Sequence, residues 1–105
     1  MDTTTLSRPS TASATDKAVA YANDNFTTFR EDLVTLAKIP SVSFPGFDPK
    51  EVDRSAEATA DLLRKRGLEN VEILRIPGAF PYVYGDWLHA PGKPTLLLYA
   101  HHDVQ

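Results

Sequence analysis

The residues best suited to chemistry lie at the carboxyl end of the chain, in the run Ala100-His101-His102-Asp103-Val104-Gln105. This run directly follows an apolar stretch, and ligands of α/β proteins gather just beyond the carboxyl ends of sheet strands. Side chains two residues apart share a face of an extended chain, so His101 and Asp103 point one way and His102 the other. A carboxylate beside a metal-binding histidine accepts the free imidazole N–H and fixes the tautomer. The spacing predicts His101 as a metal ligand and Asp103 as the residue that orients it.

The pattern His-x-Asp is short, and taken alone it arises often by chance. A histidine at a strand end can also be capped by nearby backbone groups, which is the alternative interpretation of His101. We expect His102 to be structural or to line the pocket, and His89, in a loop between strands, to be exposed.

Composition narrows the classes of function. The chain has 105 residues, 11 Lys plus Arg against 14 Asp plus Glu, a formal charge of -3 and no cysteine. The scattered basic residues give no electrostatic footprint for nucleic acid or an anionic membrane, so neither is expected as a partner. Without cysteine there is no disulfide, Cys-based zinc site or thiol nucleophile, and a metal must be bound by His, Asp and Glu.

Targeting signals are not evident in the sequence. The longest apolar run, 96–100, is far shorter than the roughly 20 residues that a membrane span requires. Residues 1–15 lack the apolar core of a secretory signal and the Arg-rich pattern of a transit peptide. A cytoplasmic location is therefore expected.

The elements that must position the motif begin after a Thr- and Ser-rich segment, 1–15, which we interpret as a disordered tail because it has little apolar surface to bury. A helix is predicted over about 17–38 because apolar residues recur on one helical face and Pro40 ends the pattern. The residues that form this face are Val19, Ala22, Phe26, Phe29, Leu33 and Leu36. A second helix is predicted between Asp48, as N-cap before Pro49, and Gly67, as the left-handed residue after its last turn.

Three strands are predicted after Gly67, over 71–76, 82–87 and 95–100. The third has no polar alternation, which is typical of a central strand buried on both faces. Two helices followed by such strands indicate the opening of an α/β domain. Because these elements cannot cover a central strand fully, we expect the chain to be the front of a longer protein. The alternative is a complete mini-domain with an open sheet edge.

Four segments, 29–43, 56–74, 81–87 and 91–105, resemble in this order the amino-terminal part of M20-family metallopeptidases, most closely their dipeptidase branch. The resemblance covers most of 17–105. Its most specific part is the apolar stretch that follows a Pro-Gly loop and leads into Ala-His-x-Asp-Val, the first metal motif of the family. Ile39-Pro40-Ser41-Val42-Ser43 is a weaker, independent agreement. The sequence departs from the family at Ala100, where glycine is common, and has a second histidine, His102, at the x position.

The resemblance implies that 16–105 is the amino-terminal portion of a zinc-exopeptidase-like α/β catalytic domain. Such enzymes hydrolyse peptide bonds of dipeptides or short peptides with two zinc ions that activate a water, and cobalt or manganese suit the same ligands. It further implies that His101 binds one zinc and Asp103 orients it, and that the full-length protein is a homodimer. The general base and the other ligands of the family lie downstream, and substrate-binding residues are not assigned.

A zinc site needs at least three protein ligands, so the 105-residue chain alone is expected to be inactive and to bind zinc weakly. The alternative function is a non-catalytic truncated paralogue or fragment with at most a binding role. A β-lactamase-like His-x-His-x-Asp-His site is disfavoured because Val104 follows Asp103 directly.

Overall fold

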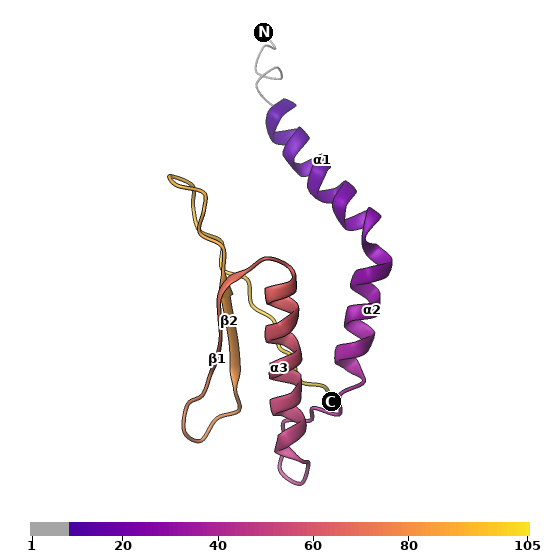
Figure 1. Cartoon of the computed structure of the whole chain (residues 1–105), viewed down its shortest axis with the longest axis vertical. Coiled ribbons are helices and arrows are strands. Elements are labelled where there is room, and N and C mark those ends of the chain that lie inside the picture. Colours follow the sequence, from indigo (N-terminus) through magenta and orange to yellow (C-terminus); the bar gives the residue numbers. More distant parts are fainter. Residues whose placement is uncertain (1–8) are drawn as a thin grey trace. The chain divides into compact units, whose positions relative to one another are not determined.

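The computed structural model describes residues 9–105, which form a mixed α/β arrangement of three helices and one two-stranded antiparallel sheet. Figure 1 shows the element order: α1 (Pro9–Asp24), α2 (Phe26–Ala37), α3 (Pro49–Lys65), β1 (Glu69–Leu74) and β2 (Tyr82–Asp86). The chain divides into two compact units, one ending at Leu33 and the other spanning Val34–Gln105.

The chain forms two helices, α1 and α2, where the sequence predicts one helix over about 17–38, and α2 extends across the boundary between the two units. The helix α1 begins at Pro9, so residues 9–15 of the predicted tail are helical, whereas residues 1–8 lie outside the described part of the chain. A proline is well tolerated at the first helical position because the missing N–H has no helical partner there. None of the helices in the described residues is long and apolar enough to cross a membrane.

The break between the two helices lies at Asn25. Its side-chain Nδ2 donates a hydrogen bond to the Tyr21 carbonyl oxygen at 2.9 Å, and its own backbone N–H donates to the same oxygen at 3.0 Å. Asparagine side chains compete in this way with the helical backbone, which explains why periodicity alone did not predict the break. The apolar stripe remains largely exposed, and no residue of α2 is buried.

The helix α3 organises the second unit and has the predicted ends. Asp48 precedes it in an extended conformation and accepts a hydrogen bond from the Lys50 N–H at 2.9 Å, with Pro49 in the first turn. After the last turn Gly67 takes a φ of 89°, in the left-handed region that glycine tolerates best. Both predicted signals of this helix are confirmed.

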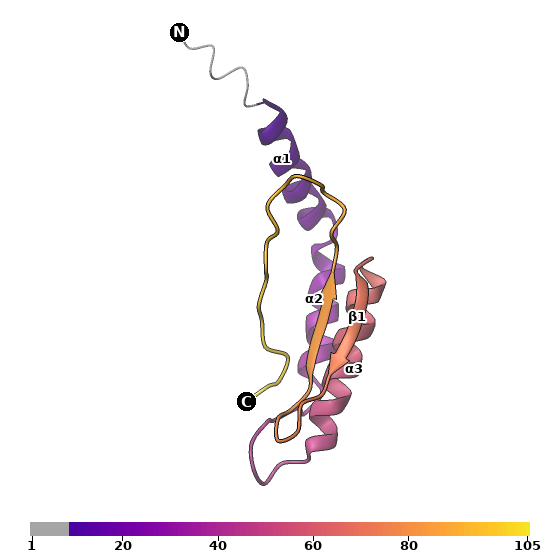
Figure 2. The same cartoon turned by 90° about the vertical axis from the view of Figure 1, so that its left-hand side faces the viewer.

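One face of α3 packs against the hairpin of β1 and β2, which lie side by side in Figure 2. The strands are paired in antiparallel register, with Leu74 opposite Tyr82 and a bulge between Glu69 and Glu72. The buried side chains of the helix are Val52, Ser55, Ala56 and Ala60. Strand β2 approaches closely at Gly85, where a Cβ atom would lie 3.3 Å from Leu63 Cδ1 and 3.3 Å from Val71 Cγ2. The first two predicted strands are thus confirmed.

The predicted third strand, 95–100, is wrong for the described residues: it has no strand pairing and its side chains face solvent. Leu97 is 87% exposed and Tyr99 is 91% exposed. A central strand is stabilised by strands on both edges and by layers on both faces, and the described residues place neither against this segment. The segment leaves the hairpin and returns without joining the sheet (Figure 2, yellow).

Candidate metal site

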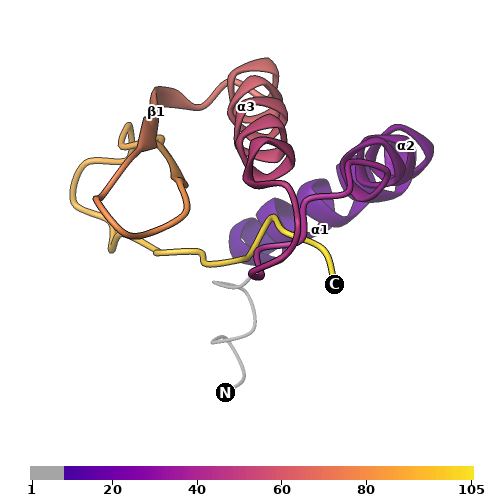
Figure 3. The same cartoon turned by 90° about the horizontal axis from the view of Figure 1, so that it is seen from below.

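The predicted metal motif meets a loop that lies far from it in the sequence. The Val104 N–H donates to the Ser41 carbonyl oxygen at 3.0 Å, and Val42 and Val104 form an isolated parallel bridge. Figure 3 shows the C-terminal segment running past the loop that leads into α3. The two sequence patterns Ile39-Pro40-Ser41-Val42-Ser43 and His101-His102-Asp103-Val104 are therefore neighbours in space.

The loop side of this contact is well anchored. Ile39 and Ser41 are buried, and two consecutive three-residue turns join the Ser41 N–H to the Ile39 carbonyl oxygen at 2.7 Å and the Val42 N–H to the Pro40 carbonyl oxygen at 3.0 Å. Ser43 follows these turns directly, so its position is tied to the buried part of the loop.

His101 and Asp103 contact each other as their spacing predicts. His101 Nδ1 lies 2.8 Å from Asp103 Oδ1, and the other carboxylate oxygen, Oδ2, accepts a hydrogen bond from the Ser43 hydroxyl. An ionised carboxylate can only accept, so His101 Nδ1 carries the proton in this pair. In the neutral ring the lone pair is then on Nε2. The His101 side chain is 69% exposed, which leaves that nitrogen accessible to a cation.

The electrostatics of Asp103 favour its ionised form. The hydrogen bond from Ser43, followed by that from His101, lowers the pKa of the Asp103 carboxyl below its ordinary value, and burial opposes this to a smaller extent than either hydrogen bond. The Asp103 side chain is 27% exposed, so it is more shielded from water than its histidine partner. It therefore remains a hydrogen-bond acceptor at neutral pH.

His102 turns toward the opposite side and contacts the body of the second unit. Its Nε2 donates to the Pro81 carbonyl oxygen at 3.1 Å, and its Nδ1 lies 2.9 Å from the hydroxyl of Ser55, a fully buried residue of α3. Ser55 Oγ also lies 2.8 Å from the His102 carbonyl oxygen, so its single hydroxyl proton is shared between this oxygen and Nδ1. Both ring nitrogens thus have protein partners, and His102 holds the motif against α3.

The third histidine lies on the hairpin side. His89 Nε2 is 2.8 Å from Glu69 Oε1, and its ring contacts Trp87 edge-on with centroids 5.2 Å apart. Its side chain is 56% exposed, as the sequence predicts for a loop histidine. This second histidine–carboxylate pair has no hydrogen bond to the motif in the structure.

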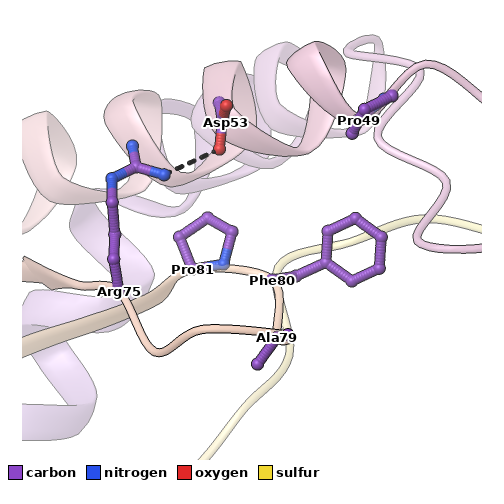
Figure 4. Close-up of a pocket in the computed structure, with 7 residues that line it drawn as sticks. Pro49, Asp53, Arg75, Ala79, Phe80 and Pro81 are labelled. Carbon is purple, nitrogen blue, oxygen red and sulfur yellow. Dashed lines mark hydrogen bonds and ion pairs between the residues drawn. The ribbon is translucent and has the colours of Figure 1, made fainter.

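A pocket of about 310 Å³ lies between α3 and the turn that joins β1 to β2 (Figure 4). Its charged lining residues, Arg75 and Asp53, form an ion pair at 3.0 Å. Phe80 and Pro81 supply apolar surface, and Pro81 is the residue whose carbonyl accepts from His102. Since the charges of Arg75 and Asp53 satisfy each other, the pocket offers no uncompensated group for a ligand.

The donor set fits one position of a metal site. Zinc takes neutral imidazole nitrogens whose other N–H is held by a carboxylate, which is the arrangement of His101 and Asp103. Among residues 9–105, no group of three or more His, Asp or Glu side chains is placed to hold a metal ion. A zinc or similar cation at this position would be held by His101 alone among the described residues.

Two residues at this site carry contacts that the sequence analysis did not foresee. Ser43 belongs to the pattern Ile39-Pro40-Ser41-Val42-Ser43, which predicts no role for it, and no sequence pattern predicts a role for Ser55. The only sequence signal for Ser55 is a polar residue next to Val52 and Ala56 on the buried face of a helix. Ser43 has no local signal, because its partner Asp103 is 60 residues away.

Comparisons with protein-family models, with curated proteins and with solved structures find no match to this chain. Function is therefore inferred from the geometry of the motif and from the sequence resemblance.

Proposed function

We propose that this chain is the amino-terminal part of the catalytic domain of a zinc-dependent, M20-like peptidase that cleaves dipeptides or short peptides in the cytoplasm. The observation that supports this most directly is the His101–Asp103 pair, in which the carboxylate holds Nδ1 at 2.8 Å and leaves Nε2 accessible. The position of this pair after an apolar stretch, and the parallel bridge to the Ile39–Ser43 loop, support it further.

In this proposal His101 is the metal ligand, through Nε2. A bound zinc supplies Lewis acidity, which activates a water and stabilises the oxyanion that develops on the peptide carbonyl. Asp103 orients the imidazole and raises its basicity as a ligand. His102 holds the motif against α3 through Ser55, so that His101 faces the opposite side.

Asp103 is a positioning residue rather than a proton-transfer group. Both of its carboxylate oxygens accept hydrogen bonds, from Ser43 and His101, and these bonds lower the pKa of its carboxyl. A general base works best with a pKa near the working pH, which this environment opposes. In this proposal the general base is therefore a residue other than Asp103, and the family resemblance places it downstream of the motif.

A zinc titration of the 105-residue chain tests the ligand assignment. The Hε1 NMR signals of the three histidines are followed as Zn²⁺ is added at pH 8. We expect the His101 signal to respond first, with weak affinity, and the response to be lost in His101→Ala. The matched control is His89→Ala, which removes the other histidine with a carboxylate partner. Equal zinc affinity of the wild type and His101→Ala would contradict the assignment.

The coding sequence beyond codon 105 tests the enzyme class. We expect the reading frame to continue with a further aspartate and an adjacent Glu-Glu pair, and the protein encoded by the extended frame to hydrolyse dipeptides in a chelator-sensitive manner. A stop codon directly after Gln105 would instead favour the non-catalytic alternative.

A further inference from the structure

Ser43 contacts the candidate metal motif without being part of it. Its hydroxyl donates to Asp103 Oδ2, while Asp103 Oδ1 lies 2.8 Å from His101 Nδ1. The three side chains form a linear series in which one carboxylate is held from both sides.

This series restricts the orientation of the Asp103 carboxylate, whose χ2 torsion angle otherwise rotates easily. The χ2 angle of Asp has a broad, roughly two-fold distribution, so a carboxylate held by one oxygen only can rotate away from its partner. With Oδ2 held by Ser43, Oδ1 is directed at the imidazole. The carboxylate at 2.8 Å and the Asp103 carbonyl oxygen at 3.1 Å then both favour a proton on Nδ1 and a lone pair on Nε2, and the carboxylate is the nearer acceptor.

Ser43 is itself held by the backbone. The turns at Ile39–Val42 and the hydrogen bond from the Val104 N–H to the Ser41 carbonyl oxygen bring the loop and the motif into register. Ser41 is fully buried, which ties this loop to the interior of the unit. The loop that carries Ser43 is therefore anchored by hydrogen bonds and burial, and this anchoring holds the Ser43 hydroxyl next to Asp103.

We propose that Ser43 is a positioning residue that sets the tautomer and the metal affinity of His101 by fixing the Asp103 carboxylate. The part of this inference that concerns metal affinity rests on the proposed metal-binding role of His101. The part that concerns the tautomer is independent of any metal.

The test uses the full 105-residue chain and reads the tautomer first. Long-range ¹H–¹⁵N NMR spectra at pH 8, without metal, distinguish protonated from unprotonated ring nitrogens of each histidine. In the wild type we expect His101 in the Nδ1–H form. In Ser43→Ala we expect a mixture of the two tautomers, and in Ser43→Thr, which keeps the hydroxyl, the wild-type form. Glu69→Gln is the matched control, since it perturbs the carboxylate partner of His89 and leaves His101 unchanged.

Zinc affinity is then measured from the His101 signal in the same variants. Removing a group that orients a ligand costs about 10–100-fold in metal affinity, and Ser43 acts one residue further out, so a loss of roughly threefold to tenfold is expected in Ser43→Ala. Ser43→Thr should restore most of it. Far-UV circular dichroism of each variant verifies that the fold is retained.

The outcomes separate the two proposals. If His101→Ala leaves zinc affinity unchanged, the proposed ligand is wrong, whereas the tautomer spectra still decide whether Ser43 orients Asp103. A second outcome is that His101→Ala abolishes the response to zinc while Ser43→Ala changes neither the His101 tautomer nor the zinc affinity. In that case His101 remains the proposed zinc ligand and the proposed role of Ser43 is wrong. A tautomer shift equal in Ser43→Ala and Ser43→Thr would also overturn it, because the hydroxyl would then not be the cause.

Discussion

Ser55 donates a hydrogen bond to the carbonyl oxygen of His102 at 2.8 Å and lies 2.9 Å from the Nδ1 atom of the same residue. One fully buried hydroxyl thereby joins the middle of α3 to the candidate metal motif, 47 residues later in the chain. This relationship has direct consequences for stability and for the site.

Ser55→Ala should lower the free energy of unfolding by about 1 kcal/mol, because it removes the buried hydroxyl that bonds to half-buried His102. The measurement is urea unfolding followed by circular dichroism, with Glu57→Ala on the exposed face of α3 as the control for helix content. If Ser55→Ala and Glu57→Ala unfold at the same urea concentration, the hydrogen bonds of Ser55 do not contribute to stability.

Tyr84 should titrate above the ordinary range of tyrosine. Its hydroxyl donates to Asp86 Oδ2 at 2.7 Å, and this hydrogen bond is the main cause that raises the pKa of Tyr84. A raised pKa favours the neutral phenol in the folded state, so its contribution to stability is present below the ordinary pKa near 10 and is lost as pH rises through the folded-state pKa.

The tyrosine titration is measured by NMR of the Tyr84 ring. Asp86→Asn should move the Tyr84 pKa back toward its ordinary value. Tyr82, one position along the same face of β2, serves as the internal reference in both proteins. An unchanged Tyr84 titration in Asp86→Asn would show that the carboxylate is not responsible.

Gly85→Val should destabilise the second unit by about 1–3 kcal/mol through overpacking. Even a Cβ atom at this position would lie 3.3 Å from both Leu63 Cδ1 and Val71 Cγ2, so the larger side chain forces α3 and β2 apart. Tyr82→Val places the same residue at an exposed position of β2 and is the matched control. The thermal unfolding midpoints of the two variants are compared. Equal midpoints would mean that the close contacts at Gly85 do not make a larger side chain destabilising there.

Leu97→Ser should leave the stability of the chain within about 0.5 kcal/mol of the wild type, since surface substitutions rarely change it more. The side chain is 87% exposed and contributes little burial. Val52→Ala, at a position that is 1% exposed, should instead cost roughly 2 kcal/mol.

Leu97→Ser also tests whether the exposed 95–100 segment promotes self-association without contributing to the stability of the fold. Leu97→Ser should reduce self-association of the chain, measured by analytical ultracentrifugation, because an exposed unpaired apolar segment favours edge-to-edge contacts. A large loss of unfolding free energy in Leu97→Ser would contradict the exposed position of the 95–100 segment.

Local signals account for the parts of the fold that were predicted correctly. The ends of α3 are marked by Asp48 and Gly67, whose effects act within one turn, and β1 and β2 follow from β-branched residues closed by turn formers. The break at Asn25 was missed because a polar side chain that bonds its own helix does not disturb the apolar period.

Nonlocal contacts account for what the sequence did not predict. The apolar run 95–100 was assigned to a buried strand, but burial depends on partners that a local pattern cannot supply. The contact of His101 with Asp103 followed from a spacing of two residues. The contact of Asp103 with Ser43 spans 60 residues, so spacing within a motif carries no information about it.

The parallel bridge between Val42 and Val104 also bears on the order in which the chain folds. Helix α3 and the hairpin join neighbours in sequence, whereas this bridge closes a loop of about 60 residues, and the entropy of loop closure must be overcome before the contact forms. We therefore expect the contact between the candidate metal motif and the loop at Val42 to form last during folding and to break first. In native-state hydrogen exchange, the Val104 amide should exchange faster than the amides of α3.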